Sequence, residues 1–140
     1  MFGWLRKKDK EPLVFASNVA AFDYACRQLP NAILLEADIP ALVEEEGEVG
    51  QEGEHYFRLR LADKSGGREI WGCTLKESTD YPEVGDFVGF RIVKIASDMP
   101  EGMNIIGFIS VKLAPVLVEK KGWKIEHSFT PKNIKPVVRF

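Results

Sequence analysis

The sequence predicts a mainly β domain with one N-terminal α-helix, in which the strands form a small antiparallel barrel. One segment near the N-terminus has apolar residues at helical spacing, whereas from residue 31 onward the apolar pattern has a period of two. Turn-forming segments separate the later apolar stretches, as is typical of small all-β folds. The 140 residues are 45% hydrophobic and 29% charged, which suits one globular domain with its own core.

The helix is expected within "FASNVAAFDYACRQLP", residues 15–30. Ser17 or Asn18 can accept a hydrogen bond from a free backbone N–H at its start, and Pro30 ends it. An apolar stripe follows the helical spacing and should be buried; it consists of Val19, Phe22, Cys26 and Leu29. Cys26 and Cys73 are too few for a disulfide framework, so we expect two reduced, buried thiols.

The first strand is expected in "AILLEADIPALVEEE", where the residues of one face are Ile33, Leu35, Ala37 and Ile39. Pro40 has no backbone donor, so the strand should bend, bulge or lie at a sheet edge there. Segment 44–54 contains three glycines and six glutamates, which predicts an acidic loop. Its candidate contact residues are Glu44, Glu45, Glu46, Glu48, Glu52 and Glu54.

Residues 55–62 and 69–76 are expected to form a hairpin. Because the buried face sets the register, we expect apolar residues to pair with apolar residues, which requires a loop with an odd number of residues. The resulting apolar pairs are Leu61 with Trp71, Leu59 with Cys73, and Phe57 with Leu75. On the other face the pairs are Tyr56 with Lys76, Arg58 with Thr74, and Arg60 with Gly72. A two-residue turn at Gly66-Gly67 would instead place Leu59 opposite Thr74.

Further strands are expected at residues 87–95, 105–118 and 123–129. The first is apolar on both faces and should be central, and Pro115 marks a bend or an edge in the second. Residues 31–118 contain a three-stranded meander, a "VGD" turn before a hydrophobic strand, and a long final strand. This layout resembles a five- to six-stranded OB-like barrel. "ESTDYPEVGD" leaves no room for the usual helix, so the helix at 17–29 would plug the barrel. An SH3-like barrel and a two-sheet sandwich are the alternatives.

Residues 13–129 are expected to form the domain, residues 1–12 a flexible basic and apolar tail, and residues 130–140 an extended C-terminal tail. The net charge of −2 is uneven, because residues 11–111 contain 18 acidic and eight basic side chains while both ends are basic. No apolar run approaches the ~20 residues of a membrane-spanning helix, and we expect a cytoplasmic protein. Membrane contact by residues 1–8 is not expected, since so short a segment binds only marginally.

The sequence lacks the residue spacings of common catalytic and metal sites. The histidines and cysteines lie far apart in the sequence and match no zinc motif; they are His55, His127, Cys26 and Cys73. In the favoured register Cys73 and His55 would be about 13 Å apart, four residues at ~3.3 Å each, which is too far for a catalytic dyad. No phosphate-binding loop occurs. We therefore predict no catalytic residues, no metal and no cofactor.

The sequence thus predicts a small non-catalytic β-barrel interaction module. Another protein is the expected partner, because an acidic body attracts a basic surface. Single-stranded nucleic acid is the alternative, since bases stack on aromatic side chains and cations neutralise phosphates. The candidate residues for this surface are Tyr56, Arg58, Arg60, Thr74, Lys76, Phe108 and Lys112. The acidic segment at 44–54 argues against nucleic acid because it would repel phosphate.

Overall fold

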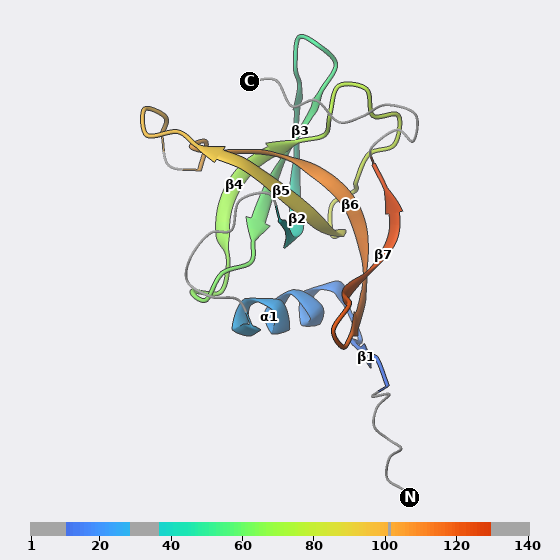
Figure 1. Cartoon of the computed structure of the whole chain (residues 1–140). Coiled ribbons are helices and arrows are strands. Elements are labelled where there is room, and N and C mark those ends of the chain that lie inside the picture. Colours follow the sequence, from blue (N-terminus) through green and yellow to red (C-terminus); the bar gives the residue numbers. More distant parts are fainter. Residues whose placement is uncertain (1–10, 29–36, 101, 130–140) are drawn as a thin grey trace, which may run out of the picture.

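The computed structural model describes residues 11–28, 37–100 and 102–129 (Figure 1). It contains one helix and seven strands: β1 (Leu13–Val14), α1 (Asn18–Gln28), β2 (Asp38–Val49), β3 (His55–Leu61), β4 (Arg68–Cys73), β5 (Phe87–Ile95), β6 (Ile105–Val118) and β7 (Gly122–Ser128). The prediction of a mainly β protein with one N-terminal helix is confirmed. Among the described residues, no helix is both long enough and apolar enough to cross a membrane.

The strands form one antiparallel sheet in the order β1–β6–β5–β2–β3–β4, and β7 also pairs with β6. β5 lies between β2 and β6, as its apolar residues on both faces predicted. The sheet is strongly curved (Figure 1), so that β4 and β6 contact each other. Within the described residues no strand pairing joins β4 to β6, and the sheet is therefore open rather than closed into the predicted barrel.

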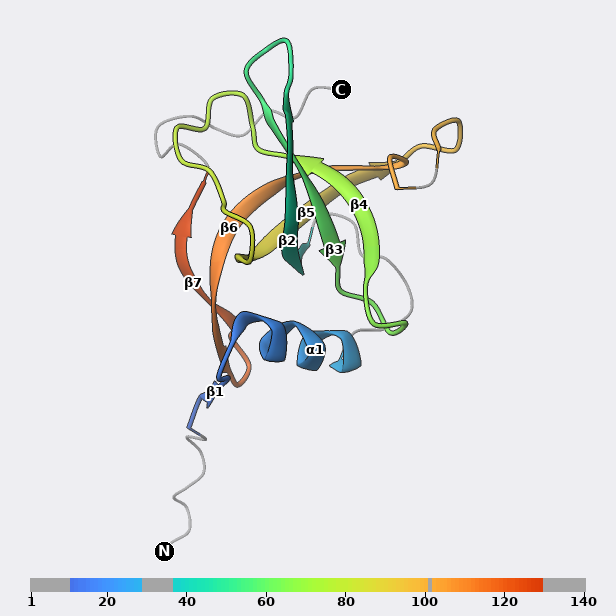
Figure 2. The ribbon, with the colours of Figure 1, turned by 180° about the vertical axis from the view of Figure 1, so that it is seen from behind.

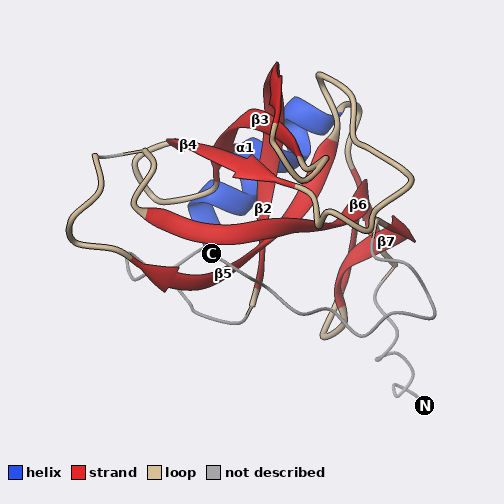
Figure 3. Ribbon diagram, turned by 90° about the horizontal axis from the view of Figure 1, so that it is seen from above, coloured by secondary structure: helices blue, strands red, loops and turns tan. Residues whose placement is uncertain are grey.

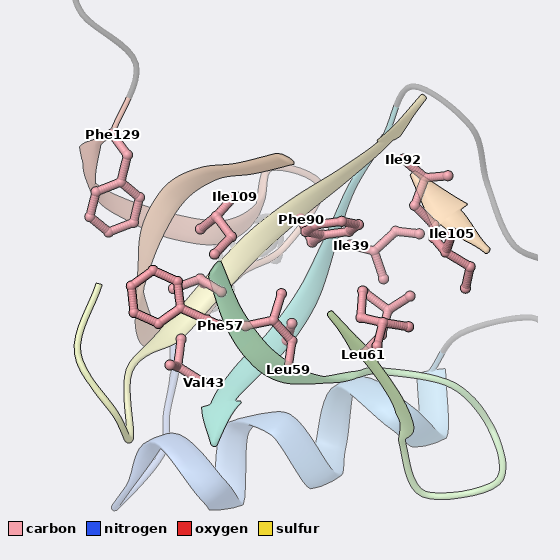
Figure 4. Close-up of a cluster of buried hydrophobic side chains, with 13 residues drawn as sticks. Ile39, Val43, Phe57, Leu59, Leu61, Phe90, Ile92, Ile105, Ile109 and Phe129 are labelled. Carbon is pink, nitrogen blue, oxygen red and sulfur yellow. The ribbon is translucent and has the colours of Figure 1, made fainter. Parts of the chain in front are cut away.

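The core has two parts, one inside the curved sheet and one under the helix. Inside the sheet, side chains from β2, β3, β5 and β6 pack together, among them Val43, Phe57, Leu59, Phe90 and Ile109 (Figure 4). The helix packs against the other cluster, which includes Leu42, Phe87 and Leu113. α1 lies across one end of the sheet (Figure 2) and beneath the strands when seen from above (Figure 3). It thus covers one end of the open sheet.

Ser17 caps α1, because its Oγ accepts a hydrogen bond from the Ala20 N–H at 3.1 Å. The predicted stripe is partly wrong, since Val19 is 57% exposed. The buried face consists of Ala21, Phe22, Ala25 and Cys26. Two alanines on this face allow the helix to approach the sheet closely. Leu29 and Pro30 lie outside the described residues, as do Ile33 and Leu35 and most of both predicted tails.

β2 extends to Val49, so the prediction of an acidic loop beginning at residue 44 is wrong. Glu45 lies opposite Arg58 of β3, and Glu46 lies opposite Phe57. Only residues 50–54 form the connection to β3. Glutamate has a low preference for strands, but here the neighbouring strand supplies cations that offset this preference. Pro40 lies within this central strand rather than at a sheet edge, and the register shifts occur after Val43.

The predicted β3–β4 register is also wrong. The observed pairing is shifted from it by three residues. Leu59 lies opposite Ile70 rather than Cys73. Apolar residues still pair, but a shift by an odd number moves every side chain of β4 to the other face. The pairs on the outer face are Tyr56 with Cys73, Arg58 with Trp71, and Arg60 with Glu69. Trp71 and Cys73 therefore lie on the outer face, contrary to the sequence prediction.

Two features explain this register. The connecting loop has six residues, 62–67, and Asp63 Oδ1 stabilises it by accepting hydrogen bonds from the Ser65 and Gly67 backbone N–H groups at 2.9 and 3.1 Å. Gly72 faces the core, where a Cβ atom would lie 2.6 Å from the ring of Phe90. The large Phe90 ring thus occupies space that a bulkier residue at position 72 would need.

β6 pairs with β5 along its first half and with β1 and β7 along its second half. Pro115 lies where the pairing of β6 with β7 is irregular, as expected for a residue without a backbone N–H. Its carbonyl accepts a hydrogen bond from the Phe15 N–H. The alternation expected for residues 123–129 is only partly present. Phe129 is buried, but Ile125 is 54% exposed because β7 lies at an edge of the sheet.

Candidate functional site

A groove of about 920 Å³ lies beside β4. Its walls come from the end of β2, the turn at 50–54, the segment following β4, the loop at 96–104 and the first residues of β6. The volume falls within the range of ligand-binding pockets, about 300–1,000 Å³. The larger apolar side chains of the lining are Trp71, Leu75, Met99, Met103, Ile105, Ile106 and Phe108. Three of them are exposed, namely Trp71 (37%), Met99 (44%) and Met103 (50%).

The groove is acidic. Its carboxylates are Glu48, Glu52, Glu54, Glu77 and Asp98, and its ammonium groups are Lys76 and Lys94. Lys76 donates to Glu52 at 3.0 Å, which neutralises one of the carboxylates. The lining keeps an excess of three negative charges. This negative charge repels a phosphate and attracts a cation. Both effects are strongest where the side chains are partly removed from water.

The acidic turn at 50–54 has an ordered backbone. The Gly50 N–H donates to the Glu54 carbonyl at 2.7 Å, and the Gly53 N–H donates to the Gly50 carbonyl at 3.1 Å. Gly53 has a φ of 87°, a conformation that side-chain-bearing residues rarely adopt. The Glu54 carboxylate also accepts from the Glu52 N–H at 3.0 Å. The carboxylates of this turn therefore have defined positions beside the groove.

The two arginines among the predicted nucleic-acid-binding residues, Arg58 and Arg60, are bound to glutamates of the neighbouring strands. Arg58 donates to Glu44 at 3.2 Å, to Glu45 at 2.9 Å and to Glu69 at 2.7 Å. Arg60 donates to Glu44 at 2.9 Å. The hydrogen bond to Glu45 is the main cause that raises the pKa of Arg58 above its usual value. A phosphate at Arg58 would compete with three carboxylates, and one at Arg60 would compete with the Glu44 carboxylate for the same cation.

The structure separates the seven candidate binding residues. Those that line the groove are Tyr56, Thr74, Lys76 and Phe108, whereas Arg58 and Arg60 do not line it. Thr74 is only 1% exposed, and Phe108 is also buried. Lys112 is not part of the groove lining, and its ammonium group lies 3.9 Å from Asp86 and 3.8 Å from Glu126. Burial raises the pKa of the Tyr56 phenol above its usual value.

The candidate glutamates also divide into two groups. Glu48, Glu52 and Glu54 line the groove. Glu44 and Glu45 bind the arginines of β3, and Glu46 is exposed. Two of the predicted acidic residues, Glu44 and Glu45, thus bind the predicted cations Arg58 and Arg60. Three of the predicted glutamates line the groove.

Sequence reasoning missed Trp71, Met99 and Met103 as site residues. Trp71 was assigned to the buried face by the wrong register. The two methionines lie in the connecting loop "SDMPEGMN", where apolar residues have no core to fill, and this pattern is the signal that could have identified them. The loop approaches β4 directly, because the Trp71 N–H donates to the Gly102 carbonyl at 2.8 Å.

Cys73 is the cysteine that lines the groove. Burial raises the pKa of the Cys73 thiol to about 11, so the thiol is protonated near neutral pH. The His55 ring stacks on Tyr81 with 3.8 Å between the ring centroids. In the described part of the chain, no group of three or more His, Cys, Asp and Glu side chains is placed to hold a metal ion.

Comparison of the chain with known protein families, with curated proteins and with solved structures finds no match. The groove combines exposed apolar side chains with an excess of carboxylates.

Proposed function

We propose that the protein is a non-catalytic interaction module whose groove binds a basic segment of another protein. The observation that supports this proposal is the combination of exposed Trp71, Met99 and Met103 with an excess of carboxylates in one groove. Apolar surface provides the driving force for association, while charge selects the partner and accelerates its approach. Methionine side chains adapt their shape to different apolar partners.

An OB-like binding mode belongs to the same proposal. OB-type folds bind ligands on their second and third strands, between the loop joining strands one and two and the loop joining strands four and five. If β2 is counted as the first strand, the corresponding loops are residues 50–54 and 96–104, and both line the groove. A cytoplasmic location is also part of the proposal, since Cys26 and Cys73 are free thiols, which suit a reducing compartment.

Single-stranded nucleic acid is the second candidate. Tyr56 and Trp71 favour it, because both aromatic rings belong to the outer face of the hairpin, where bases could stack. The charges favour protein instead. Arg58 and Arg60 are bound to glutamates, and the groove has three more carboxylates than ammonium groups.

The test is charge reversal at the groove. Peptides that bind the full chain would be selected from a random displayed library, and their dissociation constants would be measured by calorimetry. We expect the selected peptides to be rich in lysine or arginine. The triple substitution Glu48→Lys, Glu52→Lys and Glu54→Lys should weaken their binding by about tenfold or more, equivalent to about 1.4 kcal/mol.

The matched control changes the same number of charges away from the groove, at the exposed residues Glu11, Asp23 and Glu83, each to lysine. Its affinity for the selected peptides should change much less, since exposed charges more than about 10 Å apart are largely screened at 0.1 M salt. Peptides without cationic bias, or equal weakening by both triple substitutions, would contradict the proposal.

A further inference from the structure

We infer that the partner segment binds as an extended strand that pairs with the free edge of β4, and that cationic and apolar side chains alternate along it. This inference rests on the proposed function and specifies the conformation and the side-chain pattern of its ligand. It follows from the backbone of β4, from the space beside it and from the side chains around that space.

The backbone of β4 has groups that point away from β3. The Trp71 N–H points outward, because it donates to Gly102 in the 96–104 loop at 2.8 Å. In an antiparallel pair, residues bonded to the neighbouring strand alternate with residues whose backbone groups point outward. The Thr74 N–H donates to His55 of β3 at 3.2 Å, which agrees with this alternation. Cys73 is therefore the next residue with outward-pointing N–H and C=O groups.

The outward N–H and C=O groups of Cys73 have no backbone partner among the described residues. Cys73 also lines the groove. Residues 72–77 and residues 105–108 of β6 both line the groove. The single bond between Trp71 and Gly102 shows that this edge accepts another chain segment at its start. A segment beside β4 would pair with the outward backbone groups of Cys73, which is how peptides add to exposed sheet edges. Beyond Cys73 the chain turns, since the Leu75 carbonyl accepts a hydrogen bond from the Ser78 N–H at 3.0 Å, so the pairing is short.

A second polar group at the groove lacks a partner. The Thr74 hydroxyl is buried, and Thr74 Oγ1 has no hydrogen-bond partner among the described residues. Thr74 also lines the groove. A buried hydroxyl without a partner costs free energy, and a polar group of a bound segment would remove that cost.

The walls of the groove differ in chemistry, which defines the side chains of the ligand. Carboxylates come from the end of β2 and its turn, at Glu48, Glu52 and Glu54. Most apolar side chains come from β6 and the 96–104 loop, among them Met103 and Ile106, although this loop also contributes Asp98. Successive residues of a strand point to opposite sides. A segment that alternates Lys or Arg with Val or Leu can therefore offer cations to one wall and apolar groups to the other.

The test uses a short peptide in which lysine alternates with valine or leucine, and two derivatives of it. One derivative is N-methylated at every lysine, and the other at every apolar residue. A strand that pairs with β4 uses the N–H groups of only one of these sets. One derivative should therefore lose at least about tenfold in affinity, while the other should stay within about threefold of the parent peptide. Dissociation constants would come from two-dimensional amide NMR of the full chain, followed at residues 73–76.

Equal behaviour of the two derivatives, whether both bind or both fail, would overturn strand pairing. If both bind and the triple charge reversal still abolishes binding, the proposed function stands and only this inference fails. If the parent peptide does not bind, while library peptides bind in a charge-dependent way, the inference also fails alone. Shifts at residues 73–76 that appear when the protein alone is concentrated would assign the edge to a second copy of the chain, which would also overturn the inference.

Discussion

Arg58 connects three strands through one side chain. Its guanidinium, on β3, bonds Glu44 and Glu45 of β2 and Glu69 of β4. The sequence showed an alternating row of cations and a separate run of glutamates, but their pairing depends on the register, which composition does not determine. A surface that suggests nucleic-acid binding in the sequence is therefore a charge network within the sheet.

We predict that Arg58→Gln lowers the midpoint of thermal unfolding, because three neighbouring carboxylates lose their shared cation. The loss should shrink in about 1 M NaCl, where charges are strongly screened. Lys64→Gln, which removes an exposed cation from the β3–β4 loop, is the matched control and should leave the midpoint nearly unchanged. Identical melting curves for the two variants would show that the network does not contribute to stability.

Cys73 provides a pH-dependent prediction. Its pKa is raised to about 11 by burial, so the thiol keeps its proton to higher pH than a free cysteine, and the reactive thiolate is scarcer at pH 8. Alkylation by iodoacetamide at pH 8 should be at least about tenfold slower in the folded chain than in denaturant. The rate should still rise between pH 9 and pH 10, as measured by mass spectrometry of the Cys73 peptide. A plateau near pH 9 would contradict the raised pKa.

At the level of elements, the helix shows what periodicity predicts and what it leaves open. The spacing of Phe22 and Cys26 located α1 and its buried side correctly. It assigned Val19 to the same side because a stripe defined by large apolar residues overlooks alanine. Ala21 and Ala25 are buried instead, since the close approach of the helix to the sheet favours small side chains.

The helix gives a matched pair of substitutions. Phe22→Ala should lower the free energy of unfolding by about 3–5 kcal/mol, because it leaves a cavity between α1 and the sheet. Val19→Ala should change it by less than about 0.5 kcal/mol, since the side chain is 57% exposed. Urea denaturation of both variants checks this difference. A large loss for Val19→Ala would mean that the orientation of α1 is wrong.

The β3–β4 hairpin shows the limit of pairing rules. The rule that apolar residues pair across strands is satisfied by Leu59 with Ile70, yet the chosen register was wrong by three residues. Loop length decided the outcome, and the loop depends on hydrogen bonds to the Asp63 carboxylate. Such local bonds are hard to weigh from sequence, and their consequence is large because they move Trp71 to the outer face.

For the whole molecule, the sequence indicated an acidic body but not where the charge acts. Glu44 and Glu45 are used within the sheet, whereas Glu48, Glu52 and Glu54 lie at the groove. The strand composition predicted the mainly β fold. The groove could not be predicted, because residues from loops far apart in the sequence, at 50–54 and 96–104, line the same space beside β4.

The most direct test of the central claim, that this groove binds a basic protein segment, is an amide NMR titration of the full chain at low salt. The two ligands are the alternating lysine and apolar peptide and a single-stranded oligothymidylate. Binding of a basic segment in the groove predicts shifts at residues 50–54, 73–76 and 96–104 with the peptide only. It also predicts that these shifts are lost after charge reversal at Glu48, Glu52 and Glu54. Shifts at Tyr56, Arg58 and Arg60 with the oligothymidylate, and none with the peptide, would contradict it.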